Sequence, residues 1–311
     1  MRTAKEGRKA LKKDKQKKVR TKMGKRVKRV KRSSGVFIAP SFLGVMTFFV
    51  VPFIVIIYYA MVDNPISRNF VFLDNFKNII SNAAFRTAVV NTIKFAGISV
   101  PLAVVLSLLL AILLESRIPF RSQFRTFFLS PMMVPVASVV LIWQVLFHYN
   151  GLVNDIIAKF GVSPIDWLKS DQAPIVLVVL FLWKNLGYNM ILFMAALSSI
   201  PKDILEVARM ESATALQTFF YIKIRYLSST ILFVTIMSLI NSFKVFREIY
   251  LLTGDYPYDS IYMLQTFMNN TFRNLDYQKL SSAAVLMSMV MVVIIGVLFI
   301  VENRFGKDVE G

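Results

Sequence analysis

The chain has 311 residues, 56% of them hydrophobic, and its mean hydropathy of +0.57 is too high for an ordinary soluble domain. It contains no cysteine, which excludes disulfides, a thiol nucleophile and a Cys-ligated metal. With a single histidine, zinc and triad sites are not expected, and His148 is read as an ordinary interfacial residue. No G-x-x-x-x-G-K-S/T phosphate loop is present, so the chain itself should neither bind nor hydrolyse ATP.

The net charge of +19 is concentrated at the start of the chain, where residues 1–32 hold 17 of the 37 Lys and Arg residues. Such a tail could bind nucleic acid or a protein partner. We favour a disordered cytoplasmic arm over residues 1–35 that rests on anionic lipid headgroups, because a tail joined directly to a membrane span needs no other explanation. No nucleic-acid partner is therefore expected. Residues 306–311 are predicted to form a second cytoplasmic tail.

Six apolar runs are long enough to cross a hydrocarbon layer about 30 Å thick, which takes about 20 helical residues. Each run should be helical, because lipid offers no partner for free backbone groups. Residues 36–305 are thus predicted to form one all-α membrane domain, with kinks at prolines inside the spans. The predicted spans are Val36–Val62, Phe95–Leu114, Phe127–Phe147, Pro174–Leu197, Ser229–Val245 and Leu280–Val301.

The charges of the connecting loops predict the orientation. If the basic tail is inside, the inside segments carry 26 Lys and Arg residues and the outside loops carry 8. This bias favours cytoplasmic N- and C-termini. The outside loops, near residues 63–91, 148–172 and 250–282, are too short to form a substrate-binding domain. If the chain belongs to an importer, a separate protein must therefore capture the solute.

A mixed-charge segment, Ile200 to Leu227, interrupts the apolar runs. Pro201 and Asp203 favour the start of one short helix, and Ser212 interrupts it. Thr214 and Gln217 fit the S/T-x-x-E/Q capping box of a second helix. A helix pair on the membrane surface, with apolar groups on its outer side as well as its inner side, is a docking device for another protein.

Polar residues inside the spans are costly and usually face other helices or a water-filled cavity. They cluster in the fourth span and at the end of the fifth, with Arg247 and Glu248 just beyond it. Aromatic rings and amides suit the faces and hydroxyls of a sugar. The simpler reading of each residue is a hydrogen bond between helices. The candidate substrate-binding residues are Trp183, Lys184, Asn185, Leu186, Gly187, Tyr188, Ser238, Asn241, Ser242 and Lys244.

Two lysines and a tryptophan in these spans have more than one interpretation. Lys184 and Lys244 could extend to the outer interface, with Lys244 pairing Glu248 four residues later, or they could meet an acidic substrate such as a uronate. In the third span, Trp143 and Gln144 form a weaker polar pair that could also face a cavity, but we favour a lipid-interface anchor for Trp143.

The segment after Ile200 resembles the EAA loop of ABC importer permeases, whose pattern is roughly E-A-A-x-x-D-G-A, nine residues, then I-x-L-P. The residues at those places are Glu206, Val207, Ala208, Glu211, Ser212 and Ala213. Three departures stand out. Glu211 replaces Asp, Ser212 replaces the Gly of the tight turn, and Arg225-Tyr226 replaces Leu-Pro. Because Ser tolerates positive φ poorly, a turn of different shape is one expectation.

Other stretches resemble maltose-type carbohydrate permeases, and the resemblance covers about residues 36 to 305. They are Trp183–Pro201, Arg125–Pro135, Phe246–Pro257, Gly151–Asn154 and the closing helix with Ala283-Ala284. In those permeases the sugar site lies in the fourth-span L-G region and the fifth-span Ser/Asn region, which correspond here to Leu186, Gly187, Ser238 and Ser242.

The resemblance implies the type I ABC importer permease architecture, with six membrane helices and a cytoplasmic coupling-helix pair, in a bacterial or archaeal inner membrane. It implies a second permease subunit, two ATPase subunits that bind ATP and Mg, and an external solute-binding protein. This chain would hold no cofactor. The residues implied in ATPase coupling are Glu206, Ala208, Glu211, Ser212, Ala213, Phe219 and Phe220.

Two alternatives to sugar import remain. One is an ABC permease for another solute, such as a polyamine or glycerol phosphate. The other is a secondary carrier, which should have buried carboxylates for ion coupling. The sequence argues against a carrier, because its carboxylates, Glu248 among them, are expected at the ends of the spans.

Overall fold

The computed structural model describes residues 38–115 and 119–305, which form helices, turns and loops with one isolated bridge between Val62 and Phe70. The predicted tails, residues 1–35 and 306–311, lie outside the described residues. The chain divides after Tyr58 into two units, which are described separately.

The first unit contributes one apolar helix, which runs from Ile38 and continues into α2 (Val51–Ala60). Its middle is a π-helical turn, η1 (Met46–Val50), in which the Val51 N–H donates to the Met46 carbonyl. Pro52 follows directly, and its ring would collide with the carbonyl four residues earlier in a regular α-helix. The wider turn therefore lies where the proline requires it.

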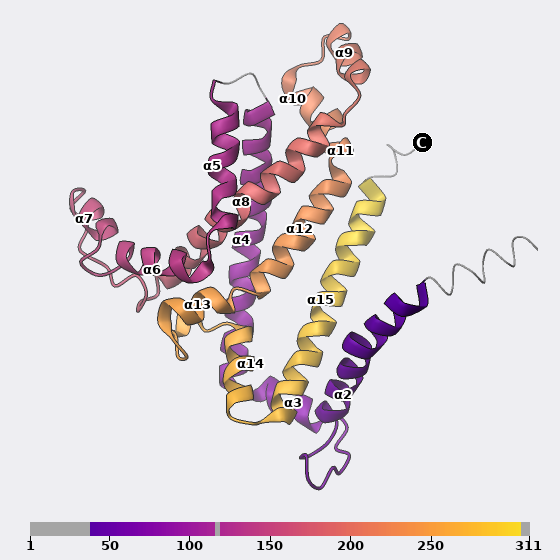
Figure 1. Cartoon of the computed structure of the whole chain (residues 1–311), viewed down its shortest axis with the longest axis vertical. Coiled ribbons are helices and arrows are strands. Elements are labelled where there is room, and N and C mark those ends of the chain that lie inside the picture. Colours follow the sequence, from indigo (N-terminus) through magenta and orange to yellow (C-terminus); the bar gives the residue numbers. More distant parts are fainter. Residues whose placement is uncertain (1–37, 116–118, 306–311) are drawn as a thin grey trace, which may run out of the picture. The chain divides into compact units, whose positions relative to one another are not determined.

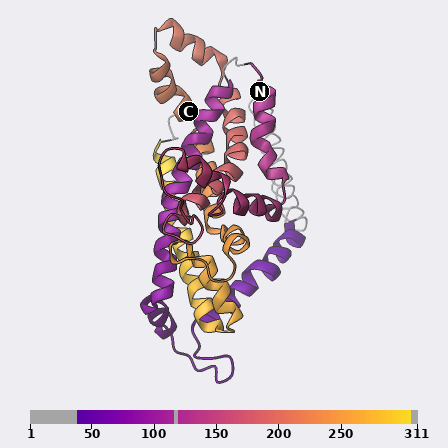
Figure 2. The same cartoon turned by 90° about the vertical axis from the view of Figure 1, so that its left-hand side faces the viewer.

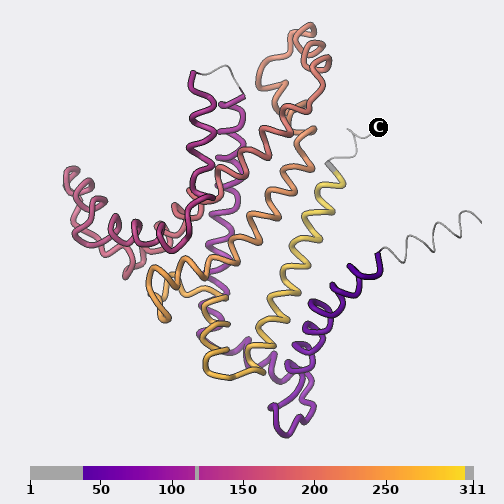
Figure 3. Tube along the Cα trace, in the orientation of Figure 1, coloured from indigo at the N-terminus to yellow at the C-terminus, as the bar shows by residue number. Residues whose placement is uncertain are grey.

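The second unit is built around three long helices. Helix α8 packs along α4, and α12 packs against both, as Figures 1 and 3 show. Shorter helices extend from both ends of this group, and Figure 2 gives the view from the side. The helices are α3 (Asp74–Ser81), α4 (Ala83–Glu115), α5 (Arg121–Met133), α6 (Val136–Leu146), α7 (Leu152–Ala158), α8 (Ala173–Ser198), α9 (Lys202–Met210), α10 (Ala215–Gln217), η2 (Thr218–Lys223), α11 (Ile224–Tyr226), α12 (Ser228–Phe243), α13 (Phe246–Thr253), η3 (Asp259–Ile261), α14 (Leu264–Arg273) and α15 (Tyr277–Phe305).

The prediction of an all-helical membrane protein is confirmed. Within the described residues, five helices are long and apolar enough to cross a membrane, and a sixth candidate is a bent pair. That pair, α5 and α6, occupies the third predicted span and turns by 102°. Pro135 causes the break, because it holds Val134 extended and lacks the N–H that would continue the helix.

The second span also differs from its prediction. Helix α4 begins at Ala83, twelve residues before the predicted Phe95, because its first turns are polar enough to lack an apolar signal. Pro101 lies inside α4, which continues through it. The 33 residues of α4 span about 50 Å at 1.5 Å per residue, well beyond a hydrocarbon layer of about 30 Å.

Segments predicted to be cytoplasmic lie together in space, whereas α7, in the predicted outer loop 148–172, lies away from α3 and α14 (Figure 1). Helices α9 and α10, the start of α5 and the end of α15 lie toward one end of the second unit, and α3 and α14 lie at the other (Figure 1). We call these the α9 end and the α14 end. The charge pattern predicts that the α9 end is cytoplasmic.

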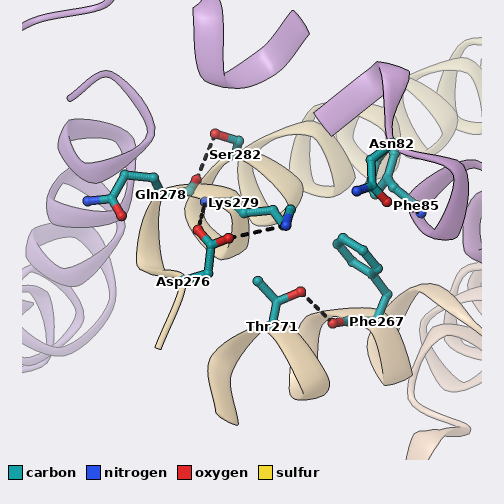
Figure 4. A network of polar contacts seen from close by, with 8 residues as sticks. All are labelled: Asn82, Phe85, Phe267, Thr271, Asp276, Gln278, Lys279 and Ser282. Carbon is teal, nitrogen blue, oxygen red and sulfur yellow. Dashed lines mark hydrogen bonds and ion pairs between the residues drawn. The ribbon is translucent and has the colours of Figure 1, made fainter. Parts of the chain in front are cut away.

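At the α14 end, short polar contacts fix the turn from α14 into α15 (Figure 4). The Lys279 N–H donates to Asp276 Oδ1 over 3.1 Å, and the Lys279 ammonium pairs with Asp276 Oδ2 at 3.2 Å. The Phe267 ring meets the edge of Phe85 from α4, with ring centroids 5.5 Å apart. The ring contact holds α14 against the first turns of α4, and the Asp276–Lys279 contacts fix the start of α15.

Helices α5 and α8 are in close contact at Gly187, where an added β-carbon would overlap the Phe128 carbonyl oxygen. We expect Gly187→Ala to destabilise the protein by about 1–3 kcal/mol, because two helix backbones would have to separate. The measurement is the thermal unfolding midpoint of the purified protein in detergent.

Gly97 in α4 is the matched control, since an added β-carbon there meets nothing within 4 Å. Gly97→Ala should leave the midpoint unchanged or raise it slightly. Equal midpoints for the two variants would contradict a close helix crossing at Gly187.

Candidate functional site

Polar side chains connect α8 to α12 inside the apolar core. The Asn241 amide donates to Asn185 Oδ1 over 2.9 Å, and the Asn189 amide donates to Ser238 Oγ over 3.0 Å. Asn189 and Ser238 are buried, so their hydrogen bond joins the two helices, and neither residue lines the cavity described below. Hydrogen bonding between helices, the simpler of the two sequence interpretations, describes this pair.

An ion pair between a partly exposed lysine and a buried carboxylate lies beside Asn185. Lys184 Nζ donates to Glu248 Oε1 over 2.5 Å, and Glu248 is only 6% exposed. The expected pairing of Lys244 with Glu248 is wrong, because the helix breaks at Lys244 and α13 starts anew at Phe246. Glu248 is also buried, contrary to its expected place at a span end. It is neutralised by Lys184, however, so it is not an isolated carboxylate of the kind a proton-coupled carrier needs.

These residues line a cavity of about 310 Å³ between α8, α12 and the start of α13. Three cationic side chains and one carboxylate contribute to its wall, so its formal charge is +2. Its lining residues are Leu180, Phe181, Lys184, Asn185, Asn241, Lys244, Val245, Arg247 and Glu248. The structure thus brings together four predicted site residues, which are Lys184, Asn185, Asn241 and Lys244.

Sequence reasoning placed Arg247 and Glu248 just beyond the fifth span and left them out of the site. The signal that could have found them is their distance along the chain from Lys244. Because α13 begins at Phe246, Arg247 and Glu248 lie about one helical turn after Lys244 and line the same cavity.

The other predicted site residues lie outside this cavity lining. Gly187 is at the α5–α8 crossing, and Ser238 and Ser242 are buried between helices, where the Ser242 hydroxyl donates to the Leu239 carbonyl over 2.7 Å. Leu186 and Tyr188 are half-buried. Their contact with a substrate stays a prediction, as does that of Trp183, which is 36% exposed.

Trp143 is not a lipid-interface anchor. It is 9% exposed, belongs to the core beside the cavity, and stacks on Phe147 with ring centroids 5.2 Å apart. The 102° bend between α5 and α6 turns α6 against α13. Trp143 is thereby buried, whereas a straight span would orient it differently. Trp183 lies 6.3 Å from the Trp143 ring.

The predicted helix pair at the α9 end is confirmed, and its turn is well defined. The Ala213 N–H donates to the Ala208 carbonyl and the Ser212 N–H to the Arg209 carbonyl, which is the Schellman pattern of a helix C-terminus. Ser212 holds the left-handed position with φ +56°, where glycine is usual. The turn therefore keeps the shape that glycine would allow, and the expectation of a different shape is not met.

The second helix of the pair starts at the expected capping box. Thr214 accepts from the Gln217 N–H, and the Gln217 side chain accepts from the Thr214 N–H. The helix then continues through the π-helical segment η2 into α11. Phe219 points inward against the core, whereas Phe220 is 61% exposed. Of the two phenylalanines offered for docking, the structure exposes Phe220.

The exposed surface of this pair, which we call the coupling surface, is more apolar than predicted. Glu206, Glu211 and Ser212 are exposed as expected, and Ala208 is buried. The sequence analysis did not name several exposed apolar residues of this surface. Their position opposite the buried face of the helix pair could have indicated them. They are Val207, Met210, Leu216 and Tyr221.

The coupling surface is firmly attached to the central helices. Leu205 and Phe219 pack against a buried cluster that includes Leu197 of α8 and Leu114 of α4. Lys223 pairs with Glu115 at the end of α4, with 3.0 Å between Nζ and Oε2. A displacement of the helix pair must therefore move the ends of α4 and α8.

A helical bundle with several candidate membrane spans, a polar cavity between its helices and an exposed helix pair at one end is the architecture expected of a membrane permease. The protein family described as "Binding-protein-dependent transport system inner membrane component" matches residues 103–310. The chain belongs to this family. It is a multi-pass inner-membrane permease of a binding-protein-dependent ABC importer and a non-catalytic component.

Known relatives and a solved structure agree with this. The trehalose/maltose transport system permease protein of Thermococcus litoralis is 27% identical over 78% of this chain and 82% of that protein. The sn-glycerol-3-phosphate transport system permease protein of Yersinia pestis is 27% identical over 77% of this chain and 81% of that protein. A chain of the bacterial alginate ABC transporter has the same fold, with a TM-score of 0.78 and 20% identity. That structure is a complex with an alginate pentasaccharide-bound periplasmic protein, and the match covers 90% of this chain and 98% of that chain.

Ser212 provides a test of the turn. A left-handed non-glycine residue costs about 1–2 kcal/mol, partly offset by the greater freedom of an unfolded glycine. Ser212→Gly should therefore stabilise the turn by at most about 1 kcal/mol, and slow hydrogen exchange at the Ser212 and Ala213 amides. Ser212→Val is the control and should speed it, because β-branched residues tolerate this conformation worst. Faster exchange in the glycine variant would contradict the turn.

Proposed function

We propose that this chain is one of two membrane-spanning subunits of an ATP-driven importer that translocates a sugar or oligosaccharide delivered by an external solute-binding protein. The observation that carries the proposal is the course of α8. Its first half lines the cavity at Leu180 to Asn185, and its last turn packs through Leu197 against the buried side of the helix pair that carries the coupling surface. One rigid helix thus joins a substrate cavity to a docking surface.

The proposed mechanism is alternating access. Two ATPase subunits dock on the coupling surface at a cytoplasmic α9 end. They bind the ATP and Mg, and this chain does not. When they close, the coupling helices move with the ends of α4 and α8, to which Lys223 and Phe219 attach them. The cavity then opens toward the α14 end, where the binding protein releases its solute, and a second permease subunit completes the pathway.

A hydroxylated solute fits the cavity chemistry. Asn185 and Asn241 contribute amides, Phe181 contributes an aromatic ring, and the free oxygen of Glu248 can accept from a hydroxyl. The similarity to a trehalose/maltose permease supports a sugar. The similarity to a glycerol-3-phosphate permease at the same identity supports the alternative, import of a smaller polyol phosphate.

The docking role is tested by Leu216→Asp. Leu216 is 71% exposed on the coupling surface, so the change should not unfold the bundle. A carboxylate in an apolar contact should loosen copurification of the ATPase subunits, and lower ATP hydrolysis stimulated by the loaded binding protein by more than about tenfold, given about 1.5–3 kcal/mol for one buried leucine.

Leu216→Met, which keeps the apolar contact, is the matched control and should behave as the native protein. Normal coupling by Leu216→Asp would remove the docking role. Solute movement by the purified chain alone, without nucleotide hydrolysis, would overturn the proposed function as a whole.

A further inference from the structure

The cavity between α8, α12 and α13 carries more positive charge than its own residues neutralise. Lys184 and Glu248 cancel each other through their 2.5 Å contact. Lys244 and Arg247 are both exposed, and within residues 38–115 and 119–305 neither makes an ion pair or a side-chain hydrogen bond. Two cations thus line one side of a space of about 310 Å³.

The hydrogen-bonding groups of the cavity are also unbalanced. The Asn185 amide donates to the Phe181 carbonyl, and its oxygen accepts from Asn241. Most of the donors left for a solute are therefore the N–H groups of Lys244 and Arg247, up to three and five respectively. The acceptors left include Glu248 Oε2, which is buried without a partner.

A ligand that matches these groups needs anionic oxygens for the cations and a hydroxyl for Glu248. A neutral sugar could supply hydroxyls, but it would leave the charges of Lys244 and Arg247 without a counter-ion in the cavity. A planar carboxylate or a phosphate fits the guanidinium of Arg247 through paired hydrogen bonds.

We propose that the solute translocated through this cavity is anionic, a hydroxylated molecule whose carboxylate or phosphate is held by Lys244 and Arg247 while Glu248 Oε2 accepts from one of its hydroxyls. The proposal rests on the proposed function, because it assigns the substrate class of the same importer. Lys184 acts as a positioning residue, since its ion pair fixes the orientation of Glu248.

Binding to the purified complete importer tests the proposal directly. Trp183 is adjacent in sequence to Lys184, so tryptophan fluorescence provides a titration signal. The probes are a galacturonate trisaccharide, its neutral methyl ester and glycerol 3-phosphate, which separate a carboxylate from a phosphate and both from a neutral sugar. At least one anion should bind about tenfold or more tightly than the ester, and the preference should weaken with salt.

The double variant Lys244→Met with Arg247→Met should abolish this preference, and Lys159→Met, an exposed lysine outside the cavity, should keep it. Equal binding of anion and ester, or no binding of either anion at millimolar concentration, would overturn the proposal. Dissociation of the second permease subunit from the double variant would also overturn the proposal. That result would mean that Lys244 and Arg247 pair with the second subunit and not with the solute.

The two proposals can fail separately. Uptake into proteoliposomes that requires ATP hydrolysis, with no preference for anions, leaves the importer intact and removes the acidic substrate. Absence of ATP-driven uptake for every solute delivered by the binding protein removes both.

Discussion

The packing of α8 against α4 and α5 determines where everything else in the second unit can lie. Gly187 allows the α5 and α8 backbones to touch, and the polar pairs with Asn241 and Ser238 hold α12 alongside. Neighbours on several sides fix the position of α8 along its length. Its middle contributes Lys184 to the cavity, and its last turn supports the helix pair at the α9 end through Leu197. A rigid connection of this kind transmits displacement, because close-packed interiors deform little.

The ion pair between Lys184 and the buried Glu248 shows how the cavity keeps its shape. Removing a carboxylate from water is costly unless a cation accompanies it, so Glu248 and Lys184 stabilise each other's position between α8 and α13. The pair also explains why a buried carboxylate does not make this chain an ion-coupled carrier. Its charge is matched internally, and the remaining cations, Lys244 and Arg247, are left for other partners.

Much of this arrangement was predictable from the sequence, and the failures have identifiable causes. Long apolar runs and the capping box of Thr214 depend on local patterns, which is why the spans and the coupling pair were found. The partner of Glu248 and the burial of Trp143 depend on two helix breaks, at Pro135 and Lys244, that redirect the chain. Prolines predicted a kink but not its 102° angle. Contacts between distant helices carry no signature in a single sequence, so the cavity wall could be assembled only in three dimensions.

The length of α4 has a consequence for how the chain meets molecules outside the membrane. About 20 Å of this helix exceeds the thickness of the hydrocarbon layer. Helices α3 and α14 both pack against α4, and α14 does so on its first turns through Phe85. In the proposed importer, the extra length of α4 would carry these two helices beyond the hydrocarbon layer, where a solute-binding protein could contact them without entering the membrane.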